Sequence, residues 1–250
     1  MRLCSLLAVF LLAVAVSPAR CGGPITGRFL VVGETPQPAR LDPGRDACCR
    51  EAGPIDESLL VGPEGGLANL VVWVVSEVGT PPRAAGAEPL VLTNAGCAFQ
   101  PRVVLARVGQ TLTLANDDPT THNVNATFRR NASFNVVLEP NGRRDFLLDK
   151  VEPKPGPVAC NIHPFMRSWV LVRDDPYFAV TTADGRFAIS EGLPAGRIRL
   201  QMWHEGRYLA GVSTVHGETD RRGRLEIDPV EGPQDLGVIR LPVERFLPTE

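Results

Sequence analysis

The sequence lacks the features that mark several common functional classes. Its 26 Lys and Arg are balanced by 28 Asp and Glu, which leaves a formal net charge of −2 at pH 7. Nucleic-acid binders carry a basic excess, so we expect no nucleic-acid partner. No Gly-x-Ser-x-Gly motif surrounds Ser133, Ser168 or Ser213, and no glycine-rich loop opens a helix. Hydrolysis and phosphate binding are therefore not indicated.

Long helical patterns are also lacking. The 23 prolines and 24 glycines would interrupt helices often, which favours short strands joined by turns. A hydrophobic share of 44% with 22% charged residues is typical of a packed globular protein. We therefore expect a protein whose core is built from strands.

Beyond its first twenty residues the chain has no apolar run that approaches membrane length. Residues 1–19 combine a basic start, an apolar segment at 3–16 and small residues at 17–19, the order of a cleaved signal peptide. We expect a periplasmic or secreted protein without a transmembrane segment after cleavage. Lipid anchoring at Cys21 is a weaker alternative, because Arg20 is a poor fit to the small residue that this pathway needs.

The cysteine count is odd after signal cleavage. The cysteines that remain are Cys21, Cys48, Cys49, Cys97 and Cys160. Disulfides are permitted in exported proteins, and an odd count indicates that one thiol has another use. Neighbouring cysteines rarely bridge each other, so we expect Cys48 or Cys49 to bridge to Cys97. The sequence leaves open which of the two pairs, and a set of free buried thiols is the alternative.

Short segments rich in Val, Leu and Thr, bounded by Gly, Pro, Asn or Asp, predict strands. They cover residues 25–33, 67–76, 101–109, 110–117, 143–151 and 168–174. Thr111, Leu112, Thr113 and Leu114 alternate, which is typical of a sheet with one buried face. The predicted fold class is all-β, as an antiparallel sandwich or Greek-key barrel.

A second, smaller β unit is expected at residues 176–250. Two strand-like runs flank Asp184-Gly185, which favours a hairpin, and residues 223–243 would supply the closing strands. This region resembles the transthyretin-like or carboxypeptidase-regulatory-like modules, which are small β-sandwiches often appended to exported proteins.

Three candidate metal ligands, Cys160, His163 and Met166, are spaced three residues apart at the start of the segment "CNIHPFMRSWVLV", residues 160–172. Sulfur ligands such as Cys160 and Met166 hold Cu(I), while the imidazole of His163 accepts either oxidation state of copper. A blue copper site needs a second histidine from a distant strand. His122 follows the alternating strand and is placed to supply it.

The motifs "C-x-x-HPFMR" and "HNV" resemble those of the cupredoxins, the blue copper proteins of the amicyanin and plastocyanin type. The resemblance implies one type-1 copper with the ligands His122, Cys160, His163 and Met166. It also implies that Asn123 braces the cysteine loop and directs a backbone N–H at the sulfur. Asn161 and Ile162 depart from the usual Ser or Thr and from Pro, which puts the hydrogen bond that locks this loop in doubt.

The resemblance covers roughly residues 90–175. It implies a Greek-key cupredoxin-like copper domain at 24–175, followed by the small β-sandwich at 176–250. The two-part layout is similar to exported bacterial proteins labelled methylamine-utilisation or plastocyanin-like proteins.

The function implied is one-electron transfer by a protein that is not an enzyme. An exported cytochrome or dehydrogenase would be the redox partner, and His163 would expose its imidazole edge within a patch that includes Pro164 and Phe165. A non-catalytic carbohydrate-binding, scaffold or copper-storage protein is the alternative. Multicopper oxidation is not expected, because the chain has no His-x-His pair.

Two other histidines, His204 and His216, remain outside this pattern. His204 precedes Glu205, a pairing that also occurs in metal and acid-base sites. We expect instead that His204 ends a strand and makes a structural hydrogen bond.

Overall fold

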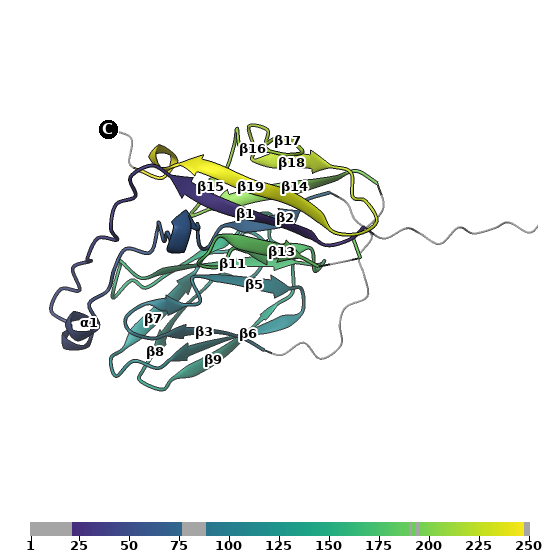
Figure 1. Ribbon diagram of the computed structural model, residues 1–250. Helices are drawn as coiled ribbons and strands as arrows, with labels where there is room; N and C mark the ends of the chain where they lie inside the picture. Colours follow the sequence, from purple (N-terminus) through teal and green to yellow (C-terminus); the bar gives the residue numbers. More distant parts are fainter. Residues whose placement is uncertain (1–21, 77–88, 191, 194–195, 248–250) are drawn as a thin grey trace, which may run out of the picture.

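The computed structural model describes residues 22–76, 89–190, 192–193 and 196–247 (Figure 1). The expected signal peptide at 1–19 and Cys21 lie outside the described residues. Within them the structure is nearly all β, so the predicted fold class is confirmed. Among the helices of this part of the chain, none is long and apolar enough to cross a membrane.

Each of the six predicted segments contains a strand. In chain order the elements are β1 (Ile25–Val32), α1 (Ala47–Ala52), η1 (Pro63–Gly65), β2 (Val71–Val74), β3 (Leu90–Asn94), β4 (Phe99–Gln100), β5 (Val103–Arg107), β6 (Gln110–Asn116), β7 (His122–Ala126), β8 (Phe134–Leu138), β9 (Arg143–Leu148), β10 (Gly156–Ala159), β11 (Arg167–Arg173), β12 (Phe178–Val180), β13 (Arg186–Ile189), β14 (Ile198–His204), β15 (Arg207–Tyr208), β16 (Ser213–Thr214), β17 (Gly217–Glu218), β18 (Arg224–Ile227), β19 (Gln234–Pro242) and η2 (Val243–Arg245).

The larger sheets stack as layers, with a hydrophobic cluster between each neighbouring pair (Figure 1). One outer layer has the strand order β13-β1-β19, and the next has β12-β2-β14-β15 with β18 beside β14. The third layer is β5-β11-β10-β7-β8 and the fourth is β4-β3-β6-β9. The lower two layers form the sandwich that carries the residues predicted to bind metal.

That lower sandwich follows the alternation seen in the sequence. Leu112 and Leu114 of β6 are fully buried in the cluster between the third and fourth layers. Thr113 faces the other way, and its hydroxyl donates to the Asp145 carboxylate on the neighbouring β9. The sheets are not purely antiparallel, however, because β5 runs parallel to β11 and β3 runs parallel to β6.

The upper sandwich differs from the expected division of the chain at residue 176. Strand β1 pairs with β13 and β19, and β2 lies between β12 and β14. The expected division at residue 176 places β1 and β2 in the copper domain instead. All four residues of β2 are buried. Val72 and Val74 pack in the upper cluster, while Val71 and Trp73 pack against the third layer. A strand with two apolar faces belongs in an inner layer, which is where β2 lies.

The hairpin expected at Asp184-Gly185 is also corrected. A tight turn is present, with the Gly185 N–H donating to the Thr182 carbonyl, but β12 and β13 then join different sheets. The turn is therefore an arch between two layers. Gly185 has φ +79° and lies so close to Phe29 that a Cβ would stand 2.1 Å from the Phe29 carbonyl oxygen, so the position requires glycine.

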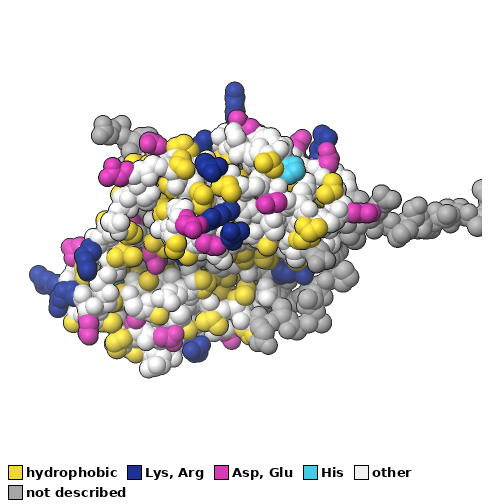
Figure 2. All heavy atoms as spheres, viewed as in Figure 1, with side chains coloured by type: hydrophobic (Ala, Val, Ile, Leu, Met, Phe, Trp, Pro, Cys, Tyr) yellow, Lys and Arg dark blue, Asp and Glu magenta, His cyan; other side chains and the backbone are white. Residues whose placement is uncertain are grey.

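The two sandwiches meet through aromatic packing and one charged clamp. The chain's three tryptophans, Trp73, Trp169 and Trp203, gather in the cluster between the second and third layers. Beside them the Arg102 guanidinium donates two hydrogen bonds to the Glu205 carboxylate, at 2.9 and 2.8 Å. The face shown in Figure 2 mixes acidic and basic side chains with apolar ones, in keeping with the small net charge.

Candidate metal centre

The segment that contains Cys160, His163 and Met166 forms the loop between β10 and β11. These strands pair antiparallel, with Ala159 opposite Arg167, so the loop begins and ends at neighbouring points. Inside it the Cys160 N–H donates to the Met166 carbonyl at 3.3 Å, and the Met166 N–H donates to the His163 carbonyl at 2.9 Å. The loop is thus a compact turn with hydrogen bonds within its own backbone.

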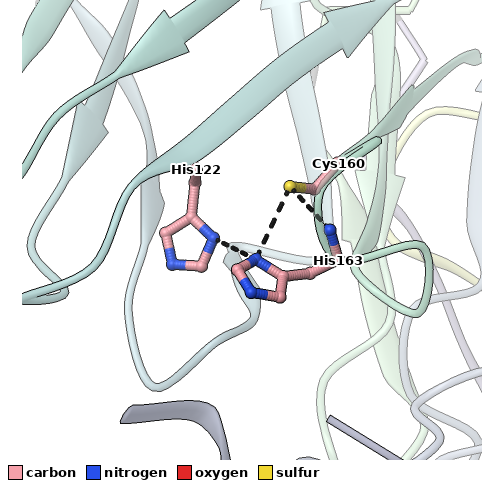
Figure 3. Close-up of side chains that lie close together, drawn as sticks. All are labelled: His122, Cys160 and His163. Carbon is pink, nitrogen blue, oxygen red and sulfur yellow. Dashed lines mark hydrogen bonds between the residues drawn. The ribbon is translucent and has the colours of Figure 1, made fainter. Parts of the chain in front are cut away.

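Three of the four predicted ligands come together, as Figure 3 shows. His122 starts β7, which neighbours β10 in the third layer, and its Nδ1 lies 2.9 Å from Nδ1 of His163. Nδ1 of His163 lies 3.9 Å from the Cys160 sulfur. The three side chains are buried. Met166 is buried on the same loop and packs in the same core cluster as Cys160.

Both imidazoles are held at their outer nitrogen by a carboxylate. Nε2 of His122 lies 2.9 Å from the Asp118 carboxylate, and Nε2 of His163 lies 3.4 Å from the Asp46 carboxylate. Burial and, next, the nearby His163 lower the pKa of His122, so its neutral form is favoured. A neutral imidazole that donates its Nε2–H to a carboxylate keeps the Nδ1 lone pair free for a metal.

The two Nδ1 atoms of His122 and His163 lie only 2.9 Å apart. In the tautomer that carries the proton on Nε2, next to Asp118 and Asp46, both Nδ1 atoms are lone-pair acceptors. Two acceptors do not stabilise one another, whereas a cation between them and the Cys160 sulfur satisfies all three. The donor set of one thiol and two imidazoles therefore fits a soft or borderline metal ion, as does the nearby thioether.

Asn123 braces the metal loop as the family resemblance implied. Its side-chain oxygen accepts the N–H groups of Asn161 at 2.6 Å and Ile162 at 3.2 Å. Because these contacts use backbone donors, the unusual side chains at 161 and 162 do not remove them. The N–H that reaches the sulfur is that of His163, at 3.3 Å, rather than the one expected from Asn123.

Helix α1 closes the outer side of the centre. Asp46 caps the helix by accepting the Cys49 N–H at 3.0 Å, and Gly53 ends it in a left-handed conformation. Cys49 is joined to Cys97 by a disulfide, which confirms the expected bridge and selects Cys49 over Cys48. Among the described cysteines, Cys48 and Cys160 are free.

His163 is less accessible than expected, because Asp46 and α1 lie over it. Its ring was predicted to expose an edge to redox partners, but the residue is only 5% exposed. The Asp46 carboxylate lies against Nε2, the atom that would otherwise face outward. Pro164 beside it is exposed and Phe165 is half-buried, so the expected apolar patch is present in part without the imidazole at its centre.

Asp46 and Asp118 are the site residues that sequence reasoning missed. Asp118 lies four residues before His122, a spacing that could have indicated a partner. Asp46 comes from a separate segment, and its only local signal is that of a helix cap before "ACCREAG". Hydrogen bonds from the Cys49 N–H and then from the Thr120 hydroxyl lower the pKa of Asp46, against the opposing effect of burial, and favour its carboxylate.

The remaining histidines lie apart from this centre. His204 ends β14 and hydrogen-bonds the Ala68 backbone, as expected, and burial lowers its pKa to about 4. Its neighbour Glu205 serves the clamp with Arg102 and also accepts the Trp169 indole N–H at 3.1 Å. His216 is exposed.

Comparisons with known proteins give partial likenesses only. No family model matches the chain, and no curated protein matches it. Among solved structures, a purple cupredoxin from Nitrosopumilus maritimus is 20% identical with a TM-score of 0.29, over 33% of this chain and 98% of that one. A Cu(I) amicyanin variant is 19% identical with a TM-score of 0.31, over 40% and 97%.

A copper-containing nitrite reductase from Thermus scotoductus SA-01 is 23% identical with a TM-score of 0.32, over 37% of this chain. This chain spans only 25% of the length of that reductase. At these scores the likenesses are local, so the assignment of the centre depends on its own geometry.

Proposed function

We propose that the protein is an exported type-1 copper protein that carries single electrons and is not itself an enzyme. The observation that carries the proposal is the meeting of three buried donor groups, the Cys160 sulfur and the imidazoles of His122 and His163, with the two Nδ1 atoms 2.9 Å apart and a carboxylate beside each Nε2. His122, Cys160 and His163 would hold the copper, with Met166 as the weak axial ligand. Thiolate, imidazole and thioether together are the donors that suit both Cu(I) and Cu(II).

Copper bound here would supply the one-electron chemistry, and the chain would keep the ligands in place. Asn123 fixes the loop through the backbone of Asn161 and Ile162, while Asp118 fixes the His122 ring. Because the ligands are already held by the fold, little rearrangement is needed when the oxidation state changes. Low rearrangement favours rapid electron transfer.

The partner in this proposal is a redox protein of the same compartment, such as an exported cytochrome or dehydrogenase. Ile162, which is 50% exposed, and the exposed Pro164 flank His163 in the loop and present apolar surface there. Redox partners use small and transient interfaces, so we propose that the partner docks on these residues.

A second candidate function is copper holding rather than electron transfer. The burial of His163 beside Asp46 favours it, since a covered imidazole edge is closed to a redox partner. The two functions differ in what leaves the protein, which is an electron in one case and the ion in the other.

The test measures both quantities on the copper-loaded mature protein. Stopped-flow reduction by a c-type cytochrome is compared for wild type, Ile162→Glu and, as a matched control, Val215→Glu, whose native side chain is 71% exposed on the β16–β17 turn. A carrier is expected to react rapidly, to slow only in Ile162→Glu and to keep its copper. Slow transfer in all three proteins, with copper lost to an added chelator, would support copper holding and contradict the carrier.

A further inference from the structure

The two carboxylates at the metal centre reach it in different ways. Asp118 belongs to the same turn as His122, four residues away. Asp46 belongs to the segment between β1 and β2, and it meets that turn across a sequence separation of 74 residues, at Thr120. This contact brings a carboxylate from a distant segment next to the buried imidazole of His163.

We propose that Asp46 is a positioning residue for His163, and that α1 with the Cys49–Cys97 disulfide forms a fastened cover over the metal centre. The functional meaning of the cover rests on the proposed copper site. The cover itself is a property of the chain without metal and can be tested without it.

Asp46 is fixed from two sides. One carboxylate oxygen accepts the Cys49 N–H at 3.0 Å and so joins Asp46 to the helix that it caps. The other accepts the Thr120 hydroxyl at 2.8 Å and lies 3.4 Å from Nε2 of His163. With both oxygens occupied, the carboxylate has one orientation, and that orientation directs His163 Nδ1 towards Cys160. The role is therefore to select the ring nitrogen that is offered to the metal.

The disulfide joins the cover to the turn that contacts the other histidine, His122, through Asp118. Cys97 lies in the turn between β3 and β4, where its N–H donates to Asp118 at 2.9 Å. The same carboxylate lies beside Nε2 of His122, so Asp118 contacts both this imidazole and Cys97, the residue to which the helix is joined. The Cys49 sulfur lies within 4.8 Å of a His163 ring nitrogen, and the Cys97 sulfur lies within 4.8 Å of a His122 ring nitrogen. The bridge thus spans the outer side of both rings.

The cover has a direct consequence for access. His163 is only 5% exposed with Asp46 and the bridge in place, so its ring edge is largely closed to solvent and to a partner. Loss of the Asp46 side chain removes the group that lies on Nε2. Loss of the bridge frees α1 from the β3–β4 turn. Both changes are expected to open His163 while leaving the sandwich core intact, because Asp46 and α1 lie outside the hydrophobic clusters.

The experiment is histidine labelling of the metal-free mature protein with diethyl pyrocarbonate, followed by mass spectrometry of each histidine. Exposed His216 gives the fast reference rate, and buried His204 gives the slow one and reports unfolding. In wild type, His163 is expected to react as slowly as His204. In Asp46→Ala, and in the double variant Cys49→Ser with Cys97→Ser, its rate should rise towards that of His216.

Asp42→Asn is the matched control, since Asp42 lies in the same segment and also accepts a backbone N–H, from Gly44 at 2.9 Å, but is exposed. It should leave His163 slow. Fast labelling of His163 in wild type would overturn the proposal, as would slow labelling in both opened variants. If His204 also becomes fast in Asp46→Ala, that variant has unfolded, and the Cys49→Ser with Cys97→Ser variant decides: fast His163 with slow His204 supports the cover, and slow His163 overturns it.

Cu(II) affinity and reduction potential show whether Asp46 positions His163 or only covers it. Asp46→Asn should weaken Cu(II) binding by about 10- to 100-fold, the usual effect of losing the partner of a ligand histidine, and should raise the reduction potential. Asp42→Asn should change neither, and unchanged affinity and potential in Asp46→Asn would contradict the positioning role. If no variant, nor wild type, binds copper at all, the proposed function fails while the labelling result still decides the cover.

Discussion

At the scale of single residues, the centre is defined by which atom each side chain leaves free. Asp118 and Asp46 occupy the Nε2 atoms of the two imidazoles, so the Nδ1 atoms meet beside the Cys160 sulfur. That His122, Cys160 and His163 lie together could be predicted from the spacing of the loop residues and from the second histidine. The carboxylates could not, because Asp46 becomes a neighbour only when a distant segment packs over the loop.

The predicted ligands should differ in rank. Cys160→Ser should abolish the visible absorption of the copper-loaded protein, because a hydroxyl is neither soft nor readily deprotonated. Met166→Leu should keep the colour and raise the reduction potential, because it removes only a weak axial donor. Absorption spectra and potentiometric titration of both variants measure these effects. Equal loss of colour in the two variants would contradict the axial role of Met166.

The buried His204 should make stability depend on pH. Its pKa is about 4 in the fold against about 6.5 in the unfolded chain, so between these values the unfolded chain binds the extra proton and stability falls as pH falls. From pH 7 to pH 5 the loss attributable to His204 is about 2 kcal/mol. Urea unfolding at both values should show a smaller loss in His204→Gln than in wild type, with His216→Gln as the exposed control.

At the scale of elements, strands could be predicted well and their partners less well. The alternation of residues 110–117 correctly gave β6 its buried face, because period two is a local property. The turn at Asp184-Gly185 was placed correctly but was wrongly assigned to a hairpin. A turn sequence specifies the local backbone, whereas the sheet that each flanking strand joins is decided by packing far along the chain.

The metal loop is an element whose shape depends on one side chain outside it. Asn123→Ala removes the acceptor for the Asn161 and Ile162 N–H groups, and the expected loss of unfolding free energy is about 2 to 3 kcal/mol. Asn125→Ala is the matched control, since it removes a single exposed contact to the Asn161 side chain and should cost less than about 1 kcal/mol. Urea unfolding of the metal-free proteins checks this, and equal losses would count against the brace.

At the scale of the whole molecule, the chain leaves the upper sandwich and returns to it. β1 and β2 belong with the strands after residue 176, while the lower sandwich is built from β3 to β11, residues 90–173, which follow β2. The sequence could not show this division, because β1 and β2 have the same strand signals as the segments of the lower sandwich. What does distinguish β2 is its burial on both faces, which agrees with the unbroken apolar run at 70–75, but this run does not specify which sheet the strand joins.

This topology predicts that residues 176–250 do not fold alone. Without β1 the outer sheet loses the strand between β13 and β19, and without β2 the next sheet loses the strand between β12 and β14. The separate fragment should show no cooperative urea transition by circular dichroism, in contrast to the mature chain. A sharp transition in the fragment would show that the two N-terminal strands are dispensable.

The central claim is that the chain holds one type-1 copper through His122, Cys160, His163 and Met166. The measurement that tests it most directly is the visible spectrum of the metal-free, reduced mature protein after addition of one equivalent of Cu(II). We predict an intense thiolate-to-copper charge-transfer band that is absent from Cys160→Ser. Binding with only the weak colour of a tetragonal nitrogen and oxygen site, unchanged in Cys160→Ser, would contradict the account.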